Sequence, residues 1–467
     1  MADRPFGFGL PDKPEDQGGQ GPGAGGNPGA GGPGGPGGPG PGGPGPGGPM
    51  GPFGGMGDPQ QFADALRQFA DMLSWRGGPV NWDLAKNVAR HAIVAGGDPS
   101  VLDAQRREIT EAVRLADLWL DEATAFPSGV RKIEAWSRSE WLEATFPVWA
   151  KFCDPIAAKG VEAMSGMFST DPAQLGEDIP EELRQALGAF GGGAGGLGGL
   201  SAMMRQIGGA MIGSQTGTAV GELAREVVGS SDIGLPLGAA GTAALLPAGV
   251  AEFGQGLSVD AGEVRLFLAL REAAHQRLFA HVPWLRAHLL GAVEQYASGI
   301  TVDIARLQEA MPEVDITNPE ALRDALSGEG LFRPEDTPAQ KAALTRLETA
   351  LALVEGWVAT VVSASARERL SHADALAEAI RRRRATGGPA ERTFATLVGL
   401  ELRPRRLREA TTIWQGLTEA RGIDGRDALW SHPDLLPASD DLENPESFVH
   451  GQPELDISDL EDDGDGS

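Results

Sequence analysis

Residues 260–281 read DAGEVRLFLALREAAHQRLFAH, and the fold can be worked out from this segment. Asp260 can cap the first turn of a helix, and Glu263 stands three residues later in a capping-box arrangement. Pro283 limits the helix at its other end because proline cannot continue one. The apolar residues recur with a helical period, and positions 271 and 275 fall on the same inward stripe, formed by Val264, Phe267, Leu268, Ala274 and Leu278.

This stripe carries a sequence that differs by one residue from a metal-binding motif. In H-E-x-x-H, two imidazoles one helical turn apart bind Zn²⁺ and the glutamate acts as general base. Arg271 stands at the first histidine position here, followed by Glu272 and His275. Arginine offers only N–H donors, so Arg271 cannot bind a metal ion. Because a buried arginine is rare unless it is paired, we expect Arg271 to have an acidic partner.

A second long helix can supply that partner. Thr337 and Pro338 begin it, and Gln340 completes another capping-box pattern. Glu355 falls on the flank of its apolar seam, which consists of Leu344, Leu347, Leu351, Val354, Val358 and Val361. We therefore expect the planar guanidinium of Arg271 to hydrogen-bond Glu355 and join the two helices.

Glu272 is a second candidate acceptor for Arg271. The alternative interpretation is that Arg271 and Glu272 are ordinary helix residues and that His275 is a hydrogen-bonded core histidine, since E-x-x-H is a common spacing. Two further histidines are weak candidates for metal ligands. His281 points off the inward face of the helix, and His288 lies beyond the proline that ends it.

Composition separates a helical body from two unusual ends. The net charge is −26, and Ala, Leu, Arg and Glu dominate the middle of the chain, which predicts a mainly α protein. Residues 1–57 contain a Gly/Pro-rich arm and residues 438–467 an acidic tail, and both are expected to be disordered. Residues 58–437 are expected to form the folded domain, with a hinge near 188–199 that would divide two subdomains.

The charge and the lone cysteine limit the classes of function. An acidic body argues against nucleic-acid binding, which needs a basic surface. The run Arg381–Arg384 is the exception; we interpret it as a solvated helix end, with docking of the acidic tail as the alternative. Cys153 is the single cysteine and fits a core thiol in a reducing, cytoplasmic compartment. The N-terminus has no pattern of a signal peptide.

Three other segments carry structural expectations. Asp98-Pro99 is expected to open a helix, and Gly422 to end one. Glycines recur every four residues along one helix face, which predicts close backbone packing against a neighbour rather than a membrane pair: Gly209, Gly213, Gly217 and Gly221. Residues 233–251 have no charge but contain prolines and glycines, so we expect a buried loop or short strand, and no membrane span.

The run AEFGQGLSVD at 251–260, with its continuation VRLFLALREAAHQRLF at 264–279, resembles the zincin-like metallopeptidase family of actinobacteria. The resemblance covers about residues 60–430 and implies a mostly helical zincin-like fold. One branch of the family has a complete H-E-x-x-H and a later E-G-H element. The resemblance implies that Glu272 matches the general base, and His275 and Glu355 match zinc ligands. Arg271 and Trp357 depart from the two remaining histidines.

These observations lead to two hypotheses. In the first, the chain is a non-catalytic binding or scaffold module, without a cofactor, whose inherited cleft takes a peptide or protein partner. In the second, it is a zinc-dependent hydrolase that uses Glu272, His275 and Glu355 with a ligand not identified from the sequence.

Overall fold

The structure is a computed structural model, and it describes residues 78–167, 196–302, 332–334, 337–385, 393 and 406–451. Several predictions lie outside these residues: the arm at 1–57, residues 188–195 of the expected hinge, and the end of the acidic tail at 452–467.

The described part of the chain is mainly helical, as the composition predicts. Its other regular structure consists of short strands and two short 3-10 helices, Ala428–Ser431 and Pro433–Leu435. β1 (Lys132–Ala135) pairs in parallel with β2 (Thr242–Leu245), and β3 (Ile300–Val302) pairs antiparallel with β4 (Phe332–Pro334). The α-helices are α2 (Trp82–Gly96), α3 (Asp103–Leu120), α4 (Arg138–Met167), α6 (Gly196–Glu226), α7 (Pro247–Gly254), α8 (Ala261–His281), α9 (Leu285–Ser298), α12 (Pro338–Ala366), α13 (Ala373–Ala385), α15 (Leu407–Asp427) and α16 (Pro445–His450).

Helix α8 begins where the sequence predicts. The Asp260 carboxylate accepts a hydrogen bond from the Gly262 backbone N–H at 2.8 Å. The expected capping box does not form, because Glu263 instead accepts the backbone N–H of His372 at 2.7 Å. The helix ends at His281, shortly before Pro283. Asp260 is therefore the cap, whereas Glu263 connects α8 to the segment before α13.

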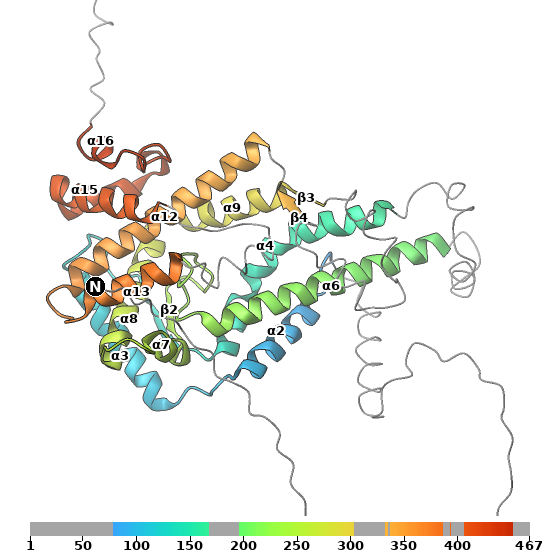
Figure 1. Ribbon diagram of the computed structural model, residues 1–467, viewed down its shortest axis with the longest axis horizontal. Coiled ribbons are helices and arrows are strands. Elements are labelled where there is room, and N and C mark those ends of the chain that lie inside the picture. Colours follow the sequence, from blue (N-terminus) through green and yellow to red (C-terminus); the bar gives the residue numbers. More distant parts are fainter. Residues whose placement is uncertain are drawn as a thin grey trace, which may run out of the picture. The chain divides into compact units, whose positions relative to one another are not determined.

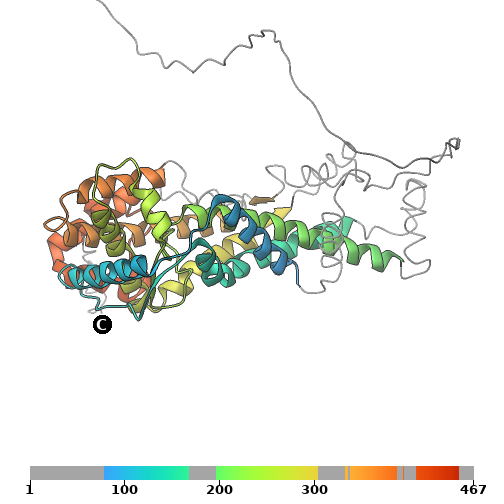
Figure 2. The same ribbon diagram turned by 90° about the horizontal axis from the view of Figure 1, so that it is seen from below.

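Helix α8 is buried on every side along its middle, which the predicted single stripe does not capture. Every residue from Phe267 to Leu278 is buried. Helices α3, α7, α12 and α13 and strand β2 all pack against α8 (Figures 1 and 2). Polar side chains at positions 271, 272 and 275 consequently need partners inside the protein, because water does not reach them freely.

The glycine stripe packs as the sequence predicts. Helix α6 lies against α2, and a Cβ added at Gly217 would meet the backbone carbonyl oxygen of Ala85 at 2.3 Å. Gly213 and Gly221 face α2 backbone in the same manner. Because a side chain there would push the helices apart, the glycines allow the backbones to approach closely, which offsets their low helix propensity.

Helix α12 is the second core helix. Thr337 accepts the backbone N–H of Gln340 at 3.2 Å, but the Gln340 side chain donates to the Tyr296 carbonyl rather than returning to the cap. By length and composition α12 could cross a membrane, yet 78% of its most apolar window is buried inside the protein. Such burial is typical of a core helix. The uncharged segment at 233–251 contains the buried strand β2 and the start of α7.

Two helix boundaries differ from the sequence-based expectations. Asp98 does not open α3, which begins at Asp103. Instead, the Asp98 carboxylate accepts hydrogen bonds from the backbone N–H groups of Arg138 and Ser139 at the start of α4. Gly422 has φ 71° and interrupts α15, but a further turn continues to Asp427. Asp98 is a long-range cap, which local sequence patterns do not reveal.

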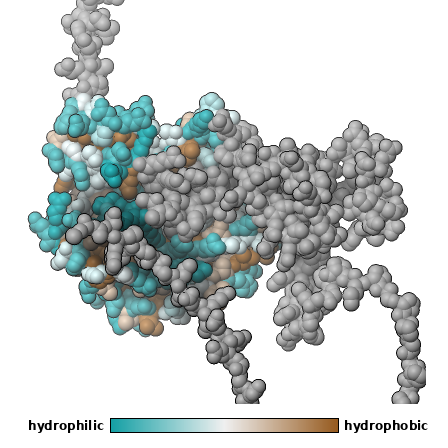
Figure 3. Space-filling view, in the orientation of Figure 1, coloured by the Kyte–Doolittle hydropathy of each residue, from teal (hydrophilic) through white to brown (hydrophobic). Residues whose placement is uncertain are grey.

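The folded part of the chain extends past residue 437, where the acidic tail was expected to begin. Residues 438–451 are part of the described structure, and Pro445–His450 form α16 against α15. Val449 is buried and lies beside Gly416 of α15. The two apolar residues Leu442 and Val449 hold this segment to the protein despite the acidic residues around them. On the face drawn in Figure 3, the described surface is mostly hydrophilic, with apolar residues in small patches.

Candidate functional site

Arg271 and Glu355 form a buried ion pair between α8 and α12, as the sequence predicts. The Arg271 Nη2 donates to the Glu355 Oε2 at 2.7 Å. Glu355 is 2% exposed and Arg271 is 8% exposed. A hydrogen bond between charged groups at this depth is strong and directional. The pair therefore fixes the two core helices relative to each other.

His275 belongs to the same cluster. Its Nδ1 lies 2.8 Å from the backbone carbonyl oxygen of Arg271, and its Nε2 lies 3.0 Å from the Glu355 Oε1. A carbonyl oxygen only accepts hydrogen bonds, and so does an ionised carboxylate. The Nδ1 therefore donates to the carbonyl oxygen of Arg271, and the Nε2 faces the Glu355 carboxylate, so both ring nitrogens are engaged inside the cluster.

Two arginines of α13 complete the cluster, a role that the sequence pattern did not reveal. The Arg384 Nη2 donates to the Glu355 Oε1 at 2.8 Å and to the Asp232 backbone carbonyl at 2.7 Å. Arg383 forms an ion pair with the Asp232 carboxylate at 3.0 Å. The interpretation of the arginine run as a solvated helix end is thus wrong for Arg383 and Arg384. It fits Arg381 and Arg382, which lie exposed and bond Glu378.

The cluster keeps Glu355 ionised. Burial by itself raises the pKa of this carboxyl, but the charges of Arg384 and Arg271, together with His275, hold the pKa well below its ordinary value. For Arg384 the balance differs: burial lowers its pKa, and Glu355 and Asp232 partly restore it. Glu355 is therefore the common anion for two guanidinium groups from different helices.

Glu272 is held apart from this cluster. Its carboxylate accepts hydrogen bonds from the hydroxyl groups of Ser230 and Ser231, the latter at 2.6 Å. The backbone N–H of Ala244, in β2, and the side chain of Gln276 also donate to it. Glu272, the second candidate acceptor for Arg271, therefore has other hydrogen-bond partners. Consecutive residues of a helix do not face the same side, so Arg271 and Glu272 meet different neighbours, and Glu272 ties α8 to β2 and the segment before it.

Trp357, two residues after Glu355 in α12, has a structural partner of its own. Its Nε1 donates to the Asp427 Oδ1 at 2.8 Å, and the same carboxylate pairs with Arg426. The ring also contacts Phe126. The indole thus helps to join α12 to the end of α15.

The other candidate groups lie in separate environments. The ring of His281 stacks on Phe126, and that of His288 meets Trp284 edge-on. Within the described ranges, no three His, Cys, Asp or Glu side chains are grouped so that they could hold a metal ion. Cys153 is buried, as expected for a core thiol, and burial raises its pKa to about 12.

A cavity of about 460 Å³ opens beside the Arg271–Glu355 pair. Arg271 and Phe267 of α8 and Glu355 of α12 line it, together with residues of α13 and α15. The buried pair therefore forms part of a surface that a small ligand can reach. Glu272, the residue matched to a general base, is not among the lining residues.

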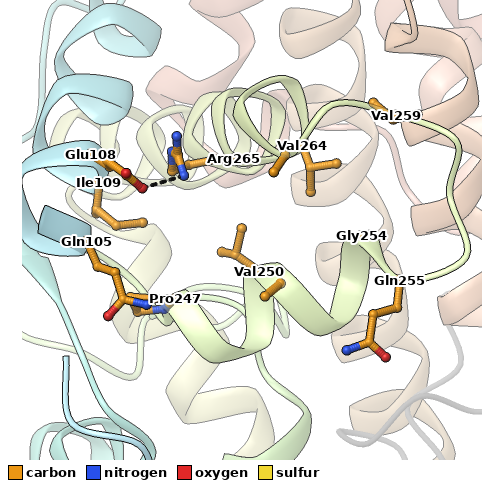
Figure 4. A pocket seen from close by; sticks show the side chains of 12 residues that line it. Gln105, Glu108, Ile109, Pro247, Val250, Gly254, Gln255, Val259, Val264 and Arg265 are labelled. Carbon is orange, nitrogen blue, oxygen red and sulfur yellow. Dashed lines mark hydrogen bonds and ion pairs between the residues drawn. The ribbon is translucent and has the colours of Figure 1, made fainter. Parts of the chain in front are cut away.

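A second cavity, of about 300 Å³, borders α8 beside α3 and α7. In Figure 4, Ile109 of α3, Val250 of α7 and Val264 of α8 face its interior. Arg265 and Glu108 form an ion pair of 2.7 Å at its side. Four of its twelve lining residues come from the 251–260 run that carries the family resemblance: Ala251, Gly254, Gln255 and Val259.

Comparisons with known proteins give a family from the sequence and a similar fold from a solved structure. A sequence profile described as zincin-like metallopeptidase matches residues 80–449. A solved structure from Chloroflexus aurantiacus, of a protein provisionally described as a hydrolase with a novel fold, aligns with a TM-score of 0.53. The alignment has 21% sequence identity and covers 79% of this chain and 97% of that one. No match was found among curated proteins. The profile covers most of the chain, which therefore belongs to the zincin-like metallopeptidase family.

Proposed function

We propose that this chain is a non-catalytic member of its family that acts as a binding module for a peptide or protein partner. The observation that carries the proposal is the 2.7 Å bond between Arg271 and Glu355. Arg271, at the position that corresponds to the first zinc ligand, is a permanent cation. It is hydrogen-bonded to Glu355, the carboxylate that corresponds to the third ligand.

The residues present do not fit the zinc ion that the family name implies. Catalytic zinc needs three protein ligands with available lone pairs. Arg271 has none, and both nitrogens of His275 face oxygen acceptors. Glu355 is already bonded to two guanidinium groups, whose charges would repel a dication. The donor set argues for an ion-pair cluster in place of a metal centre.

The position of Glu272 supports the same conclusion. A general base must reach the water or the proton on which it acts. The Glu272 carboxylate instead accepts hydrogen bonds from Ser230, Ser231 and Gln276, and it is 3% exposed. With its oxygens engaged in this way, Glu272 braces the fold and is poorly placed to activate water.

Family membership favours a second candidate, a zinc-dependent hydrolase that uses Glu272, His275 and Glu355. Zinc content separates the two. The full chain, purified after expression in zinc-supplemented medium, is expected to contain far less than one equivalent of zinc by elemental analysis. One equivalent of zinc in the wild type, lost in Glu355→Gln, would favour the hydrolase and overturn the binding-module proposal.

A gain-of-metal variant makes the experiment sharper. Arg271→His supplies the missing imidazole and removes one opposing charge, while Arg384→Gln removes the other. We expect the double variant to take up more zinc than either single variant, because both cations compete for the same carboxylate. Arg265→His is the matched control, since it adds a histidine to α8 next to the other cavity. Equal uptake by the control and the double variant would contradict the assigned geometry.

A further inference from the structure

The larger cavity has a mixed lining. Arg271 and Glu355 are its buried charged residues, and it also carries polar and charged side chains from α12, α13 and α15, among them Ser363, Asp374, Glu378, Arg381, Arg408 and Gln415. Apolar side chains from several helices form much of the remaining surface: Phe267, Val362, Ala377, Ile380 and Leu407. Its volume of about 460 Å³ is within the range of small-molecule sites. Such a cavity suits a ligand with an apolar body and one charged end.

Arg271 has donors that Glu355 does not use. A guanidinium carries five N–H donors and usually binds a carboxylate through two parallel hydrogen bonds. Here Arg271 contacts only the Oε2 of Glu355, because the Oε1 is bonded by His275 and Arg384. Among the described residues, the guanidinium of Arg271 has no other hydrogen-bond partner. The part of Arg271 that remains exposed lines the cavity.

The other charges of the cavity wall do not compete for Arg271. Glu378 is paired with Arg381 and Arg382 on the same helix. Asp374 lies exposed in the first turn of α13, where solvent and the helix dipole accommodate it. Arg408 also lines the cavity and adds a second positive charge. The unused hydrogen-bond donors on the buried wall of the cavity thus belong to a cation, Arg271.

We propose that this cavity binds a carboxylate carried on an apolar group, with the free N–H groups of Arg271 as the anchor. The C-terminal residue of a peptide has this chemistry, and so does a free aliphatic carboxylic acid. The proposal rests on the binding-module function and names the chemical class of its ligand. It requires Arg271 to keep its bond to Glu355, so that the ligand carboxylate is a second partner of the same guanidinium.

Calorimetric titration of the full chain tests this proposal. The probes are N-acetyl-leucyl-leucine with a free carboxylate, its C-terminal amide, and octanoate, each up to about 5 mM, which covers weak small-ligand binding. We expect the free carboxylate to bind at least about tenfold more tightly than the amide, because a hydrogen bond to a charged group is lost. Tighter binding of the dipeptide than of octanoate would identify a peptide C-terminus, and the reverse order a free acid. Equal affinity for acid and amide, or no binding of either acid, would overturn the proposal.

Matched variants locate the site. Ala377→Phe fills the cavity from α13 without removing either member of the ion pair, and it should abolish binding. Ala251→Phe fills the other cavity and should leave binding unchanged, as should Arg265→Met. Arg271→Met should remove the preference for acid over amide. Loss of binding in both cavity-filling variants, or in neither, would contradict the assignment.

The experiment also separates this inference from the proposed function. Titrations are performed on protein treated with a chelator, so a carboxylate preference is measured whether or not the chain can hold zinc. If the zinc-free protein binds neither acid, the carboxylate site alone is overturned. Stoichiometric zinc in the untreated chain would overturn the proposed function alone.

Discussion

Two arginines of α8, six residues apart in sequence, each form an ion pair with a glutamate of another helix. The two pairs have the same N–O distance but different surroundings. Arg265 and Glu108 lie 2.7 Å apart beside one cavity, with side chains 26% and 49% exposed. Arg271 and Glu355 also lie 2.7 Å apart beside the other cavity, with side chains 10% and 2% exposed. Contact distance does not distinguish them, so any difference in their energetic contribution must come from burial and from the neighbouring charges.

The buried carboxylate has more hydrogen-bond partners than the exposed one, as burial of a charge requires. The bond to Arg265 is the one hydrogen bond to the Glu108 carboxylate among the described residues, and water solvates the rest of that group. Glu355 has little water and is instead bonded by Arg271, Arg384 and His275. A buried charge without such partners is very unfavourable, whereas an exposed one costs little. The buried guanidinium groups therefore depend on the Glu355 carboxylate for their stability in the folded protein, whereas the exposed Arg265 does not depend on Glu108 in this way.

The largest expected effect is that of removing the buried carboxylate. Glu355→Ala should lower the free energy of unfolding by about 3–5 kcal/mol, because two guanidinium groups lose their common anion. Glu108→Ala should cost about 0–1 kcal/mol. Urea unfolding of both variants at neutral pH measures the difference. Equal losses would remove the basis of the comparison.

Removing the arginine should have a smaller effect. Arg271→Met keeps an unbranched, largely apolar stem but loses the guanidinium and its bond to Glu355, at a cost of about 1.5–3 kcal/mol. Glu355 retains Arg384 and His275, so the loss stays below that of Glu355→Ala. Arg265→Met, the matched variant at the exposed pair, should cost under about 1 kcal/mol. A stable Arg271→Met protein that unfolds like the wild type would mean that Arg384 alone satisfies Glu355.

The sequence predicted the buried pair because its chemistry leaves few alternatives. A helical period placed position 271 inside, and a buried arginine needs an acidic partner. Glu355 was available on the next strongly periodic helix. The fold class, the start of α8 and the close packing of α6 were predictable for the same reason: each follows from local spacing and residue type.

Other features depend on how distant segments meet, which local spacing does not encode. Arg383 and Arg384 read as a helix end, and only the position of α13 beside α12 brings them to Asp232 and Glu355. Glu272 follows Arg271 directly, but its direction is set by Ser230 and Ser231 in a segment with no periodic signal. The consecutive apolar residues around Leu266–Leu270 were a usable sign that α8 is buried on more than one side.

Acid should narrow the difference between the wild type and a variant that lacks the buried charge. The pKa of Glu355 is lowered in the folded protein, so its contribution to stability is present above the unfolded value of about 4.3 and is lost as the pH falls through the folded value. Glu355→Gln cannot titrate at this position. The gap in unfolding free energy between wild type and Glu355→Gln should therefore be constant near pH 6–7 and shrink below about pH 4. A gap that widens in acid would reverse the assigned sign.

Salt should produce the smallest effect, and only at the exposed pair. Raising the salt concentration from about 0.1 M to about 1 M shortens the Debye length from about 10 Å to about 3 Å. The cost of Glu108→Ala should then fall by a few tenths of a kcal/mol, because solvent ions reach that carboxylate. The cost of Glu355→Ala should change less, since the protein excludes ions from Arg271 and Arg384. Urea unfolding in sodium chloride measures both, with the wild type at each salt concentration as reference. If salt weakens the buried pair as much as the exposed one, then solvent reaches Glu355, and its partners are not the reason for its low pKa.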